Sequence, residues 1–323
     1  VLVVGGIAAL GAVVLGGLFL LGGGGESPSP GITPTPTPAV PTATPVAPTV
    51  PPTPAPTPEP TPGPPTGRIA FASGVGGQWD VVVADPDGGN QVRIATGRDP
   101  QADPDISPDG TLVVYTSPTG LRIVPVEGGQ SRGLTTGGNN DRTPAWSPDG
   151  RTIAYATNAD GDYEIWLQPV DGGPATRLTN NRVDDYDPSW SPDGTRIAFV
   201  SARDGDREIW VMNADGSSPI QLTFDETPDD DPAWSPDGAK IAFASRRSGT
   251  FAIWVMNADG SDQRALTAGT LPDNDPAWSP DGHYLVFSRT YDDLRRLVVI
   301  DLEGRELVVF NVSGESALWP SWR

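Results

Sequence analysis

A four-residue motif, Ser-Pro-Asp-Gly, recurs along this chain at a nearly constant period. It begins at Ser107, Ser147, Ser191, Ser235 and Ser279, so the spacings are 40, 44, 44 and 44 residues. Repeats of about 40 to 45 residues are typical of β-propeller blades, in which each four-stranded sheet buries its apolar faces only against its neighbours. The period therefore predicts a propeller, and the function has to be sought on that scaffold.

The repeats also align outside the motif, and each contains four short apolar runs. Gly, Pro, Asp and Asn separate these runs, which indicates strands joined by tight turns rather than helices. The aligned pairs are Arg196–Ser201 with Lys240–Ser245, Glu208–Asn213 with Ala252–Asn257, and Asp231–Trp234 with Asp275–Trp278. We interpret Ser-Pro-Asp-Gly as a hairpin turn, because Gly accepts a positive φ and Asp caps its own backbone. The repeated Trp residues are expected to pack between blades.

The two ends of the repeat region complement each other. The region opens at Arg68–Phe71, which matches the second strand of a repeat, and the chain ends at Trp319–Trp322, which matches a first strand. Five complete blades and one composite blade then make six, with the C-terminal strand innermost in the composite blade. Such closure leaves no open sheet edge at the joint. The sequence therefore predicts an all-β, six-bladed propeller over residues 67–323, closed by its C-terminal strand.

The repeat as a whole resembles the TolB-type propeller. The matching elements are Asp-Pro-Ala-Trp-Ser-Pro-Asp-Gly, then Ile-Ala-Phe, then Ile-Trp-Val-Met-Asn-Ala-Asp-Gly, as in residues 231–260. The resemblance covers the propeller and not the separate α/β domain of TolB itself. It implies one of several roles, because similar repeats occur in periplasmic scaffold proteins, in the non-catalytic propeller of prolyl-oligopeptidase-like enzymes and in sensor ectodomains.

The residues before the propeller predict a membrane anchor and a spacer. Residues 1–21 are apolar or Gly without a charge, and about 20 such residues span a bilayer as a helix. We assign residues 1–25 to a transmembrane helix or signal anchor, with a cleaved signal sequence as the alternative. Residues 26–66 are rich in Pro and Thr and are expected to form a disordered, extended linker. The propeller is then periplasmic or extracellular.

Composition narrows the chemistry that the propeller can support. A formal net charge of −20 excludes nucleic acid as a natural partner and favours cationic ones. There is no cysteine, and the single histidine, His283, occupies a position that varies among the repeats. Gly-x-Ser-x-Gly, a metal-binding His pair and a P-loop are all missing from the sequence. We therefore expect a protein that is not an enzyme, with a paired-carboxylate hydrolase as the remaining catalytic alternative.

Aspartates recur just before the first strand of the blades, at two positions relative to an aligned proline. Three residues before it are Asp141, Asp185, Asp229 and Asp273, and one residue before it are Asp103, Asp187, Asp231 and Asp275. Six-fold repetition would place them on rings around one mouth of the central channel. Such carboxylates repel one another unless a cation such as Ca²⁺ or a basic partner lies among them. The alternative is that they cap loops and stay solvated. The segment Asn158–Asp162 also resembles a calcium loop, but it lacks a downstream bidentate Glu at the expected spacing, and we interpret it as a hairpin turn.

Two functions follow from these expectations. The first is a non-enzymatic, membrane-tethered binding or scaffold protein that captures a protein, peptide or glycan, most naturally a cationic one, outside the cytoplasm. The second is the sensor ectodomain of a receptor such as a transmembrane Ser/Thr kinase, whose N-terminal part would precede Val1. The propeller of an oligopeptidase-like hydrolase is a third interpretation, although the chain contains no hydrolase domain.

Overall fold

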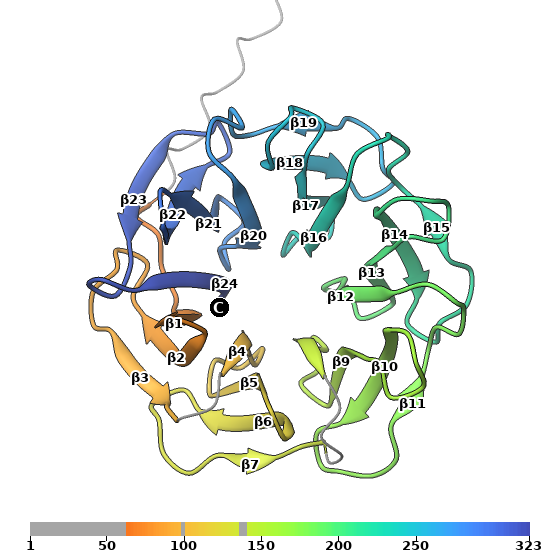
Figure 1. Ribbon diagram of the computed structural model, residues 1–323, viewed down its shortest axis with the longest axis horizontal. Helices are drawn as coiled ribbons and strands as arrows, with labels where there is room; N and C mark the ends of the chain where they lie inside the picture. The colour runs from red at the N-terminus through yellow and green to blue at the C-terminus, as the bar shows by residue number, and fades with distance from the viewer. Residues whose placement is uncertain (1–62, 98–100, 136–140) are drawn as a thin grey trace, which may run out of the picture. The chain divides into compact units, whose positions relative to one another are not determined.

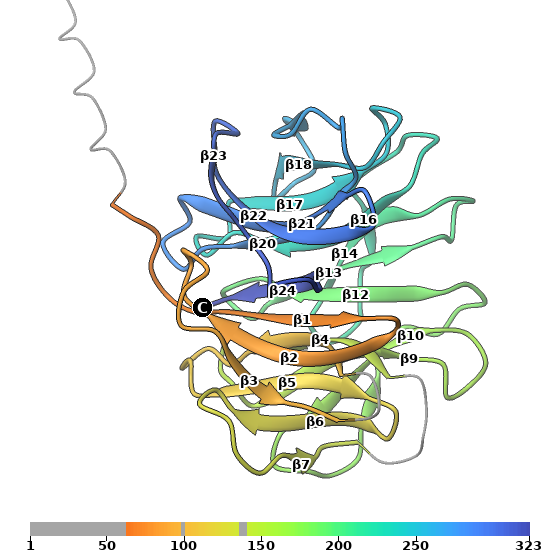
Figure 2. The ribbon, with the colours of Figure 1, turned by 60° about the vertical axis from the view of Figure 1, so that its left-hand side comes forward.

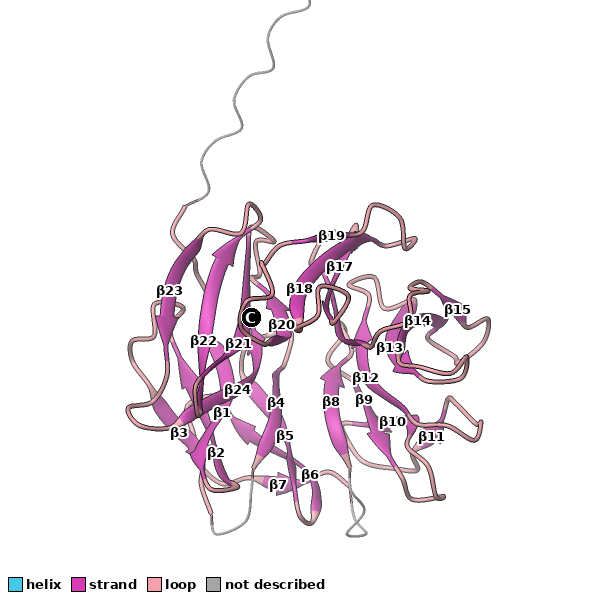
Figure 3. Cartoon of the chain, turned by 45° about the horizontal axis from the view of Figure 1, so that its top comes forward, coloured by secondary structure: helices cyan, strands magenta, loops and turns pink. Residues whose placement is uncertain are grey.

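The computed structural model describes residues 63–97, 101–135 and 141–323. The expected membrane helix (residues 1–25) lies outside these residues, as does the expected linker except for its last four residues. In the part of the chain that is described, no helix is long and apolar enough to cross a membrane. The described residues form strands, turns and loops (Figure 3).

Six four-stranded antiparallel sheets surround a central channel and form the blades of a propeller (Figure 1). The innermost strands are β4 (Ala102–Ile106), β8 (Arg142–Trp146), β12 (Asp185–Trp190), β16 (Asp229–Trp234), β20 (Asp273–Trp278) and β24 (Ser316–Trp322). The second strands are β1 (Ile69–Val75), β5 (Leu112–Ser117), β9 (Thr152–Thr157), β13 (Arg196–Ser201), β17 (Lys240–Ser245) and β21 (Tyr284–Tyr291).

The two outer layers of each blade complete the sheets. The third strands are β2 (Gln78–Ala84), β6 (Gly120–Pro125), β10 (Glu164–Pro169), β14 (Glu208–Asn213), β18 (Ala252–Asn257) and β22 (Leu294–Asp301). The outermost strands are β3 (Val92–Ala95), β7 (Arg132–Gly133), β11 (Thr176–Arg177), β15 (Ile220–Gln221), β19 (Arg264–Ala265) and β23 (Glu306–Phe310). The predicted all-β, six-bladed architecture is therefore confirmed.

The C-terminal strand closes the ring as the sequence predicts. β24 pairs with β1, so that one blade has the order β24-β1-β2-β3, and Figure 2 shows the two strands side by side. The pairing places Ile69 opposite Trp322, and backbone hydrogen bonds join Arg68 to Arg323 in both directions. Both ends of the propeller are thereby held in one sheet, and no blade has an unpaired joint.

Each Ser-Pro-Asp-Gly motif is the turn between an innermost strand and a second strand. In the turn at Ser279, the Ser279 hydroxyl donates to Asp281 Oδ1 over 2.6 Å and accepts from the Tyr284 N–H over 2.9 Å. Gly282 has φ of 73°, a conformation that costs glycine nothing. The motif is therefore structural, which confirms its interpretation as a hairpin turn.

The core consists of layers between adjacent blades. Trp278 packs into the preceding blade against Ala242 and Ile253, and its indole N–H donates to the Ala233 carbonyl over 3.0 Å. The second strands contribute fully buried Phe71, Phe199, Phe243 and Phe287. Burying one such ring stabilises the fold by about 1.5–3 kcal/mol. These contacts fix each blade against the next, so that the inner ends of the strands are held at defined positions around the channel.

Candidate functional site

A ring of residues with unusual backbone conformation lines the channel. One residue in each innermost strand has a positive φ, between 45° and 56°, although none is glycine. These residues are Trp319, Asp103, Thr143, Asp187, Asp231 and Asp275, and we refer to them as the channel ring. Each precedes a proline and lies where the pairing with the second strand shifts register, in all six blades. Proline and a bulge are both compatible with a strand whose free edge faces the channel.

Hydrogen bonds run around the channel ring from blade to blade. The N–H of Thr143 donates to Asp103 Oδ2 over 3.2 Å, and the N–H of Asp187 donates to the Thr143 hydroxyl over 3.3 Å. The N–H of Asp275 likewise donates to Asp231 Oδ2 over 3.1 Å. Positive φ turns these amides toward the neighbouring blade, and Asp tolerates this conformation better than most residues do. The ring is therefore held in place by its own backbone.

Two cavities adjoin the channel ring. One, of about 210 Å³, is lined by all six ring residues and by the prolines and most of the Trp residues that follow them in the innermost strands. The other, of about 610 Å³, is lined by five ring residues together with Ser117, Pro118, Asp141, Arg142 and Tyr186. The residues that line only the larger cavity precede the ring residues along the chain or lie near the β5–β6 turn, whereas the residues outside the ring that line only the smaller cavity follow the ring residues. The ring therefore lies between the two cavities.

The four ring carboxylates crowd one another in a space walled by protein. Burial, followed by the charges of Asp230, Asp103 and Asp275, raises the pKa of Asp187 to about 8. Burial also raises the pKa of Asp103 to about 6 and that of Asp231 well above its usual range. Desolvation disfavours the charged form, and nearby like charges add to that effect. The ring therefore carries negative charge that the protein only partly tolerates.

No arginine or lysine forms an ion pair with a ring carboxylate among the residues that the structure describes. Arg142 and Arg295 act on Asp103 and Asp275 only through space. Arg207 is engaged elsewhere, because it makes a bidentate pair with Asp230 over 2.7 and 2.8 Å. In the described part of the chain, the positive charge that would balance the ring is thus not supplied by a direct contact.

The structure places the other predicted aspartates within the blades. Asp185, Asp229 and Asp273 are fully buried, and each pairs with an arginine near the end of the second strand, at Arg203, Arg247 and Arg289 respectively. Asp141 is also buried and accepts a hydrogen bond from the Thr135 hydroxyl over 2.6 Å. We refer to these four residues as the blade aspartates. The structure brings together Asp103, Asp187, Asp231 and Asp275, and it does not bring the blade aspartates into that ring.

Sequence reasoning missed two members of the channel ring. Thr143 and Trp319 occupy the same position as Asp187, one residue before Pro144 and Pro320. Their alignment with Asp187 could have identified both residues, but the sequence prediction considered only carboxylates at this position. Asp105 was missed as well: its carboxylate accepts from the Trp146 N–H and the Ser321 hydroxyl over 2.7 and 2.6 Å, so it joins three blades beside the ring.

Solved structures share this fold at low sequence identity. TolB from Acinetobacter baumannii superposes with a TM-score of 0.72 at 24% identity, over 81% of this chain and 67% of that one. A protein assigned as TolB of Agrobacterium tumefaciens gives 0.64 at 24% identity, over 80% of this chain and 99% of that one. Hydrazine synthase of Kuenenia stuttgartiensis gives 0.65 at 15% identity, over 80% and 46%. At these identities the likeness concerns the fold alone.

Sequence comparisons identify the family of the propeller. A comparison with curated proteins found no match. The family model described as the TolB beta propeller domain matches residues 62–323, which is most of the chain and all of the described propeller. The repeat motifs, the closed six-bladed ring and the family match all agree on this fold. The chain therefore belongs to the TolB beta propeller domain family.

Proposed function

We propose that this chain is a non-enzymatic, membrane-tethered binding protein that captures a cationic segment of a protein or peptide in its channel, outside the cytoplasm. The observation that carries the proposal is the channel ring, where four carboxylates line the channel and no arginine or lysine among the described residues forms an ion pair with them. Membership of the TolB-like family supports a protein-interaction role in the periplasm or an equivalent compartment. The uncharged segment 1–21 supports the tether.

A basic side chain would relieve the repulsion within the ring. The cavity of about 610 Å³ leads to Asp103, Asp187 and Asp231, and a lysine or arginine there would meet carboxylates that are already partly desolvated. Opposite charges gain more in such a site than at an exposed surface. Charge pairs also speed association and give it a salt dependence. Binding is therefore expected to weaken as the ionic strength rises.

A bound cation is the second use of the same ring. Its donors are carboxylate oxygens and the Thr143 hydroxyl, and oxygen donors are the ligands that Ca²⁺ prefers. The full predicted set, with Asp141, Asp185, Asp187, Asp229, Asp231, Asp273 and Asp275, includes the blade aspartates, three of which already have arginine partners. We therefore restrict the proposed cation site to Asp103, Asp187, Asp231 and Asp275.

Calorimetric titration with a penta-arginine peptide, and separately with CaCl₂, tests this function. Asp187→Asn/Asp231→Asn should weaken peptide binding at least about tenfold, because each removed charge contributes on the order of 1 kcal/mol. Asp193→Asn/Asp237→Asn is the matched control, since it removes two carboxylates from exposed Ser-Pro-Asp-Gly turns. Equal losses in both variants would show that binding follows net charge and would refute the channel site. Binding of Ca²⁺ alone to the ring would assign it to an ion instead.

The tether has its own measurement. The full chain should remain with membranes after alkaline carbonate extraction, whereas a chain that begins at residue 26 should be released. Release of the full chain by carbonate would contradict the anchor and leave the channel proposal intact.

A further inference from the structure

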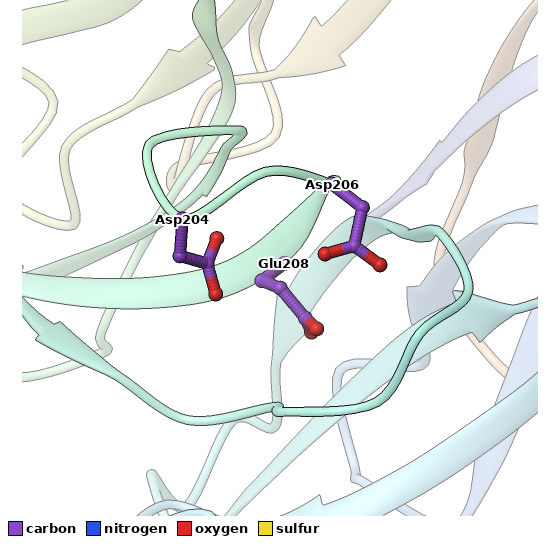
Figure 4. A group of neighbouring side chains, drawn as sticks. All are labelled: Asp204, Asp206 and Glu208. Atoms are coloured by element: carbon purple, nitrogen blue, oxygen red, sulfur yellow. The ribbon is translucent and has the colours of Figure 1, made fainter. Parts of the chain in front are cut away.

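A second group of carboxylates lies between the blade that begins with β12 and the blade that begins with β16. The turn between β13 and β14 contributes Asp204 and Asp206, and Glu208 is the first residue of β14. Asp225 precedes β16, and Asp229 is the first residue of β16. One oxygen of each of Asp204, Asp206 and Glu208 lies within 4.8 Å of the others, and the same holds for Glu208, Asp225 and Asp229. Figure 4 shows Asp204 and Asp206 on either side of Glu208. We refer to these five residues as the Glu208 cluster.

Glu208 stands at the centre of the cluster and lacks part of its hydrogen bonding. Its side chain is fully buried, with 0% of its surface exposed. One carboxylate oxygen accepts from the Thr223 hydroxyl, but Oε1 has no partner. Asp229 is also fully buried, and its Oδ1 has no partner either, although its other oxygen contacts Arg247. A buried carboxylate oxygen without a partner is costly. The aligned oxygens Glu164 Oε2 and Asp185 Oδ1 in the preceding pair of blades also lack a partner, so the Glu208 cluster is distinguished by its larger uncompensated charge.

In the preceding pair of blades, other residues of the chain pair with the equivalent carboxylates. At the aligned positions, Asp160 and Glu164 both bind Arg177, over 2.9 and 2.8 Å. The N–H of Asn181 donates to Glu164 over 2.6 Å, and its amide donates to Asp185 over 2.6 Å. In that cluster Arg177 thus joins two carboxylates, one of them the buried Glu164. In the Glu208 cluster Arg247 contacts Asp225 and Asp229 and the Gln221 amide donates to Asp204, but among the described residues no arginine or lysine pairs with Glu208.

Two substitutions between the repeats remove that compensation. Gln221 stands where Arg177 would be, and Asp225 stands where Asn181 would be. The earlier interface has four carboxylates (Asp160, Asp162, Glu164, Asp185) and two arginines (Arg177, Arg203). The Glu208 interface has five carboxylates and one arginine, Arg247. With all groups ionised, the second interface is more negative by two charges, which is the charge of one divalent cation.

The following pair of blades shows that the carboxylates are not a requirement of the fold. Ser248, Thr250 and Ala252 occupy the positions of Asp204, Asp206 and Glu208, and Gly269 occupies that of Asp225. The remaining carboxylate there, Asp273, is held by Arg289 through two contacts of 2.6 and 2.9 Å. The blades can therefore be built with no acidic cluster at all, and the Glu208 cluster keeps every carboxylate while one of the two arginines is replaced by Gln221.

From these contacts we infer that the Glu208 cluster is a Ca²⁺ site, separate from the channel. All of its donors are oxygens, and Ca²⁺ takes six to eight oxygen ligands in a flexible arrangement. Asp204 is exposed and gives access from solvent, while Glu208 and Asp229 supply buried ligands. Burial, and then the charges of Asp229, Asp225 and Asp206, raises the pKa of Glu208 to about 8. Bound Ca²⁺ would reverse that effect by favouring the ionised carboxylate.

Exchange of the two distinguishing residues between the repeats tests the site. The full chain is titrated with CaCl₂ by calorimetry in a mild detergent, and Gln221→Arg/Asp225→Asn gives the cluster the side chains of the earlier interface. This variant should lose one Ca²⁺ per chain and fold normally, because a native blade already uses that arrangement. Glu208→Gln should weaken the same site at least about tenfold. The reverse exchange, Arg177→Gln/Asn181→Asp, should create an additional Ca²⁺ site.

A channel variant separates this site from the proposed function. Asp187→Asn/Asp231→Asn should retain the Ca²⁺ that Gln221→Arg/Asp225→Asn loses. The proposal is overturned if the parent shows no saturable Ca²⁺ binding at millimolar concentrations, or if its stoichiometry is unchanged by Gln221→Arg/Asp225→Asn and by Glu208→Gln. Loss of all Ca²⁺ binding in the channel variant, or no gained site in the folded reverse variant, would overturn it equally.

Discussion

Asp229 and Asp231 lie two residues apart in β16, yet their carboxylates have opposite surroundings. Asp229 is fully buried within the blades and contacts Arg247, whereas Asp231 belongs to the channel ring and has Asp187 and Asp275 as charged neighbours. The same contrast holds for Asp185 with Asp187 and for Asp273 with Asp275. An arginine beside a blade aspartate balances charge within the fold, while the ring carboxylates have no such partner and leave their charge to a ligand.

The contrast predicts that removing an arginine from a blade aspartate is the most damaging single change. Arg289→Ala should destabilise the propeller by about 3–5 kcal/mol, because it leaves Asp273 buried without its partner. The side chains of Arg289 and Asp273 are only 13% and 1% exposed, so water cannot replace the lost contacts. Urea unfolding measures the change. The double variant Arg289→Leu/Asp273→Leu should recover much of it, and a double variant as unstable as Arg289→Ala would contradict the electrostatic explanation.

The channel ring should respond in the opposite direction. Asp231→Asn should stabilise the propeller by about 0.5–1.5 kcal/mol at neutral pH, because it removes one of four crowded carboxylates and keeps the acceptor for the Asp275 N–H. The charge of Asp187 acts on Asp231, and an amide at position 231 removes that repulsion while offering a donor to Asp187. Urea unfolding without divalent cations checks the sign. A loss of more than about 1 kcal/mol would mean that Asp231 is structural, like Asp229.

The pH dependence of stability sharpens the same comparison. The folded-state pKa of Asp187 is raised to about 8, so the folded protein binds a proton that the unfolded chain releases above about pH 4. Its contribution to stability is present in acid and is lost as the pH rises through about 8. Melting temperatures at pH 5, 6, 7 and 8 in EDTA should therefore fall less steeply for Asp187→Asn than for the parent. Parallel profiles would contradict the raised pKa.

Much of this arrangement follows from sequence periodicity, because the position of a residue in the repeat fixes how far it lies from the channel axis. The period predicted the six blades, and the proline after Asp103, Asp187, Asp231 and Asp275 marked the ring. The arginine partners did not follow from alignment. Arg247 reaches Asp229 from two residues beyond β17, whereas Arg289 holds Asp273 from the position aligned with Ser245. The sequence shows which side chains are charged. Which arginine pairs with a given aspartate depends on strand length and on how far the arginine side chain extends.

The Glu208 cluster shows a second limit of sequence reasoning. Asp160, Asp162 and Glu164 have the same spacing as Asp204, Asp206 and Glu208, so the two motifs look equivalent along the chain. They differ through the pairing of the third and outermost strands, which brings Arg177 beside one set and Gln221 beside the other. Metal-site patterns read within one hairpin cannot detect a neutralising residue that arrives from the next strand.

The smallest predicted effect tests whether the contribution of the blade aspartates to stability depends on the ion pair itself or on its burial. Arg305 pairs with Asp301 over 2.6 Å, a contact as short as that of Arg289 with Asp273, but the Arg305 side chain is 74% exposed. Asp301 also accepts the backbone N–H groups of Glu303 and Arg305 over 3.1 and 2.8 Å, so it keeps partners when the guanidinium is removed. Arg305→Ala should therefore shift the urea-unfolding midpoint far less than Arg289→Ala does. High salt should reduce even that difference, since exposed pairs are screened. A cost near that of Arg289→Ala would show that short contacts alone decide, and the distinction between buried and exposed pairs would fail.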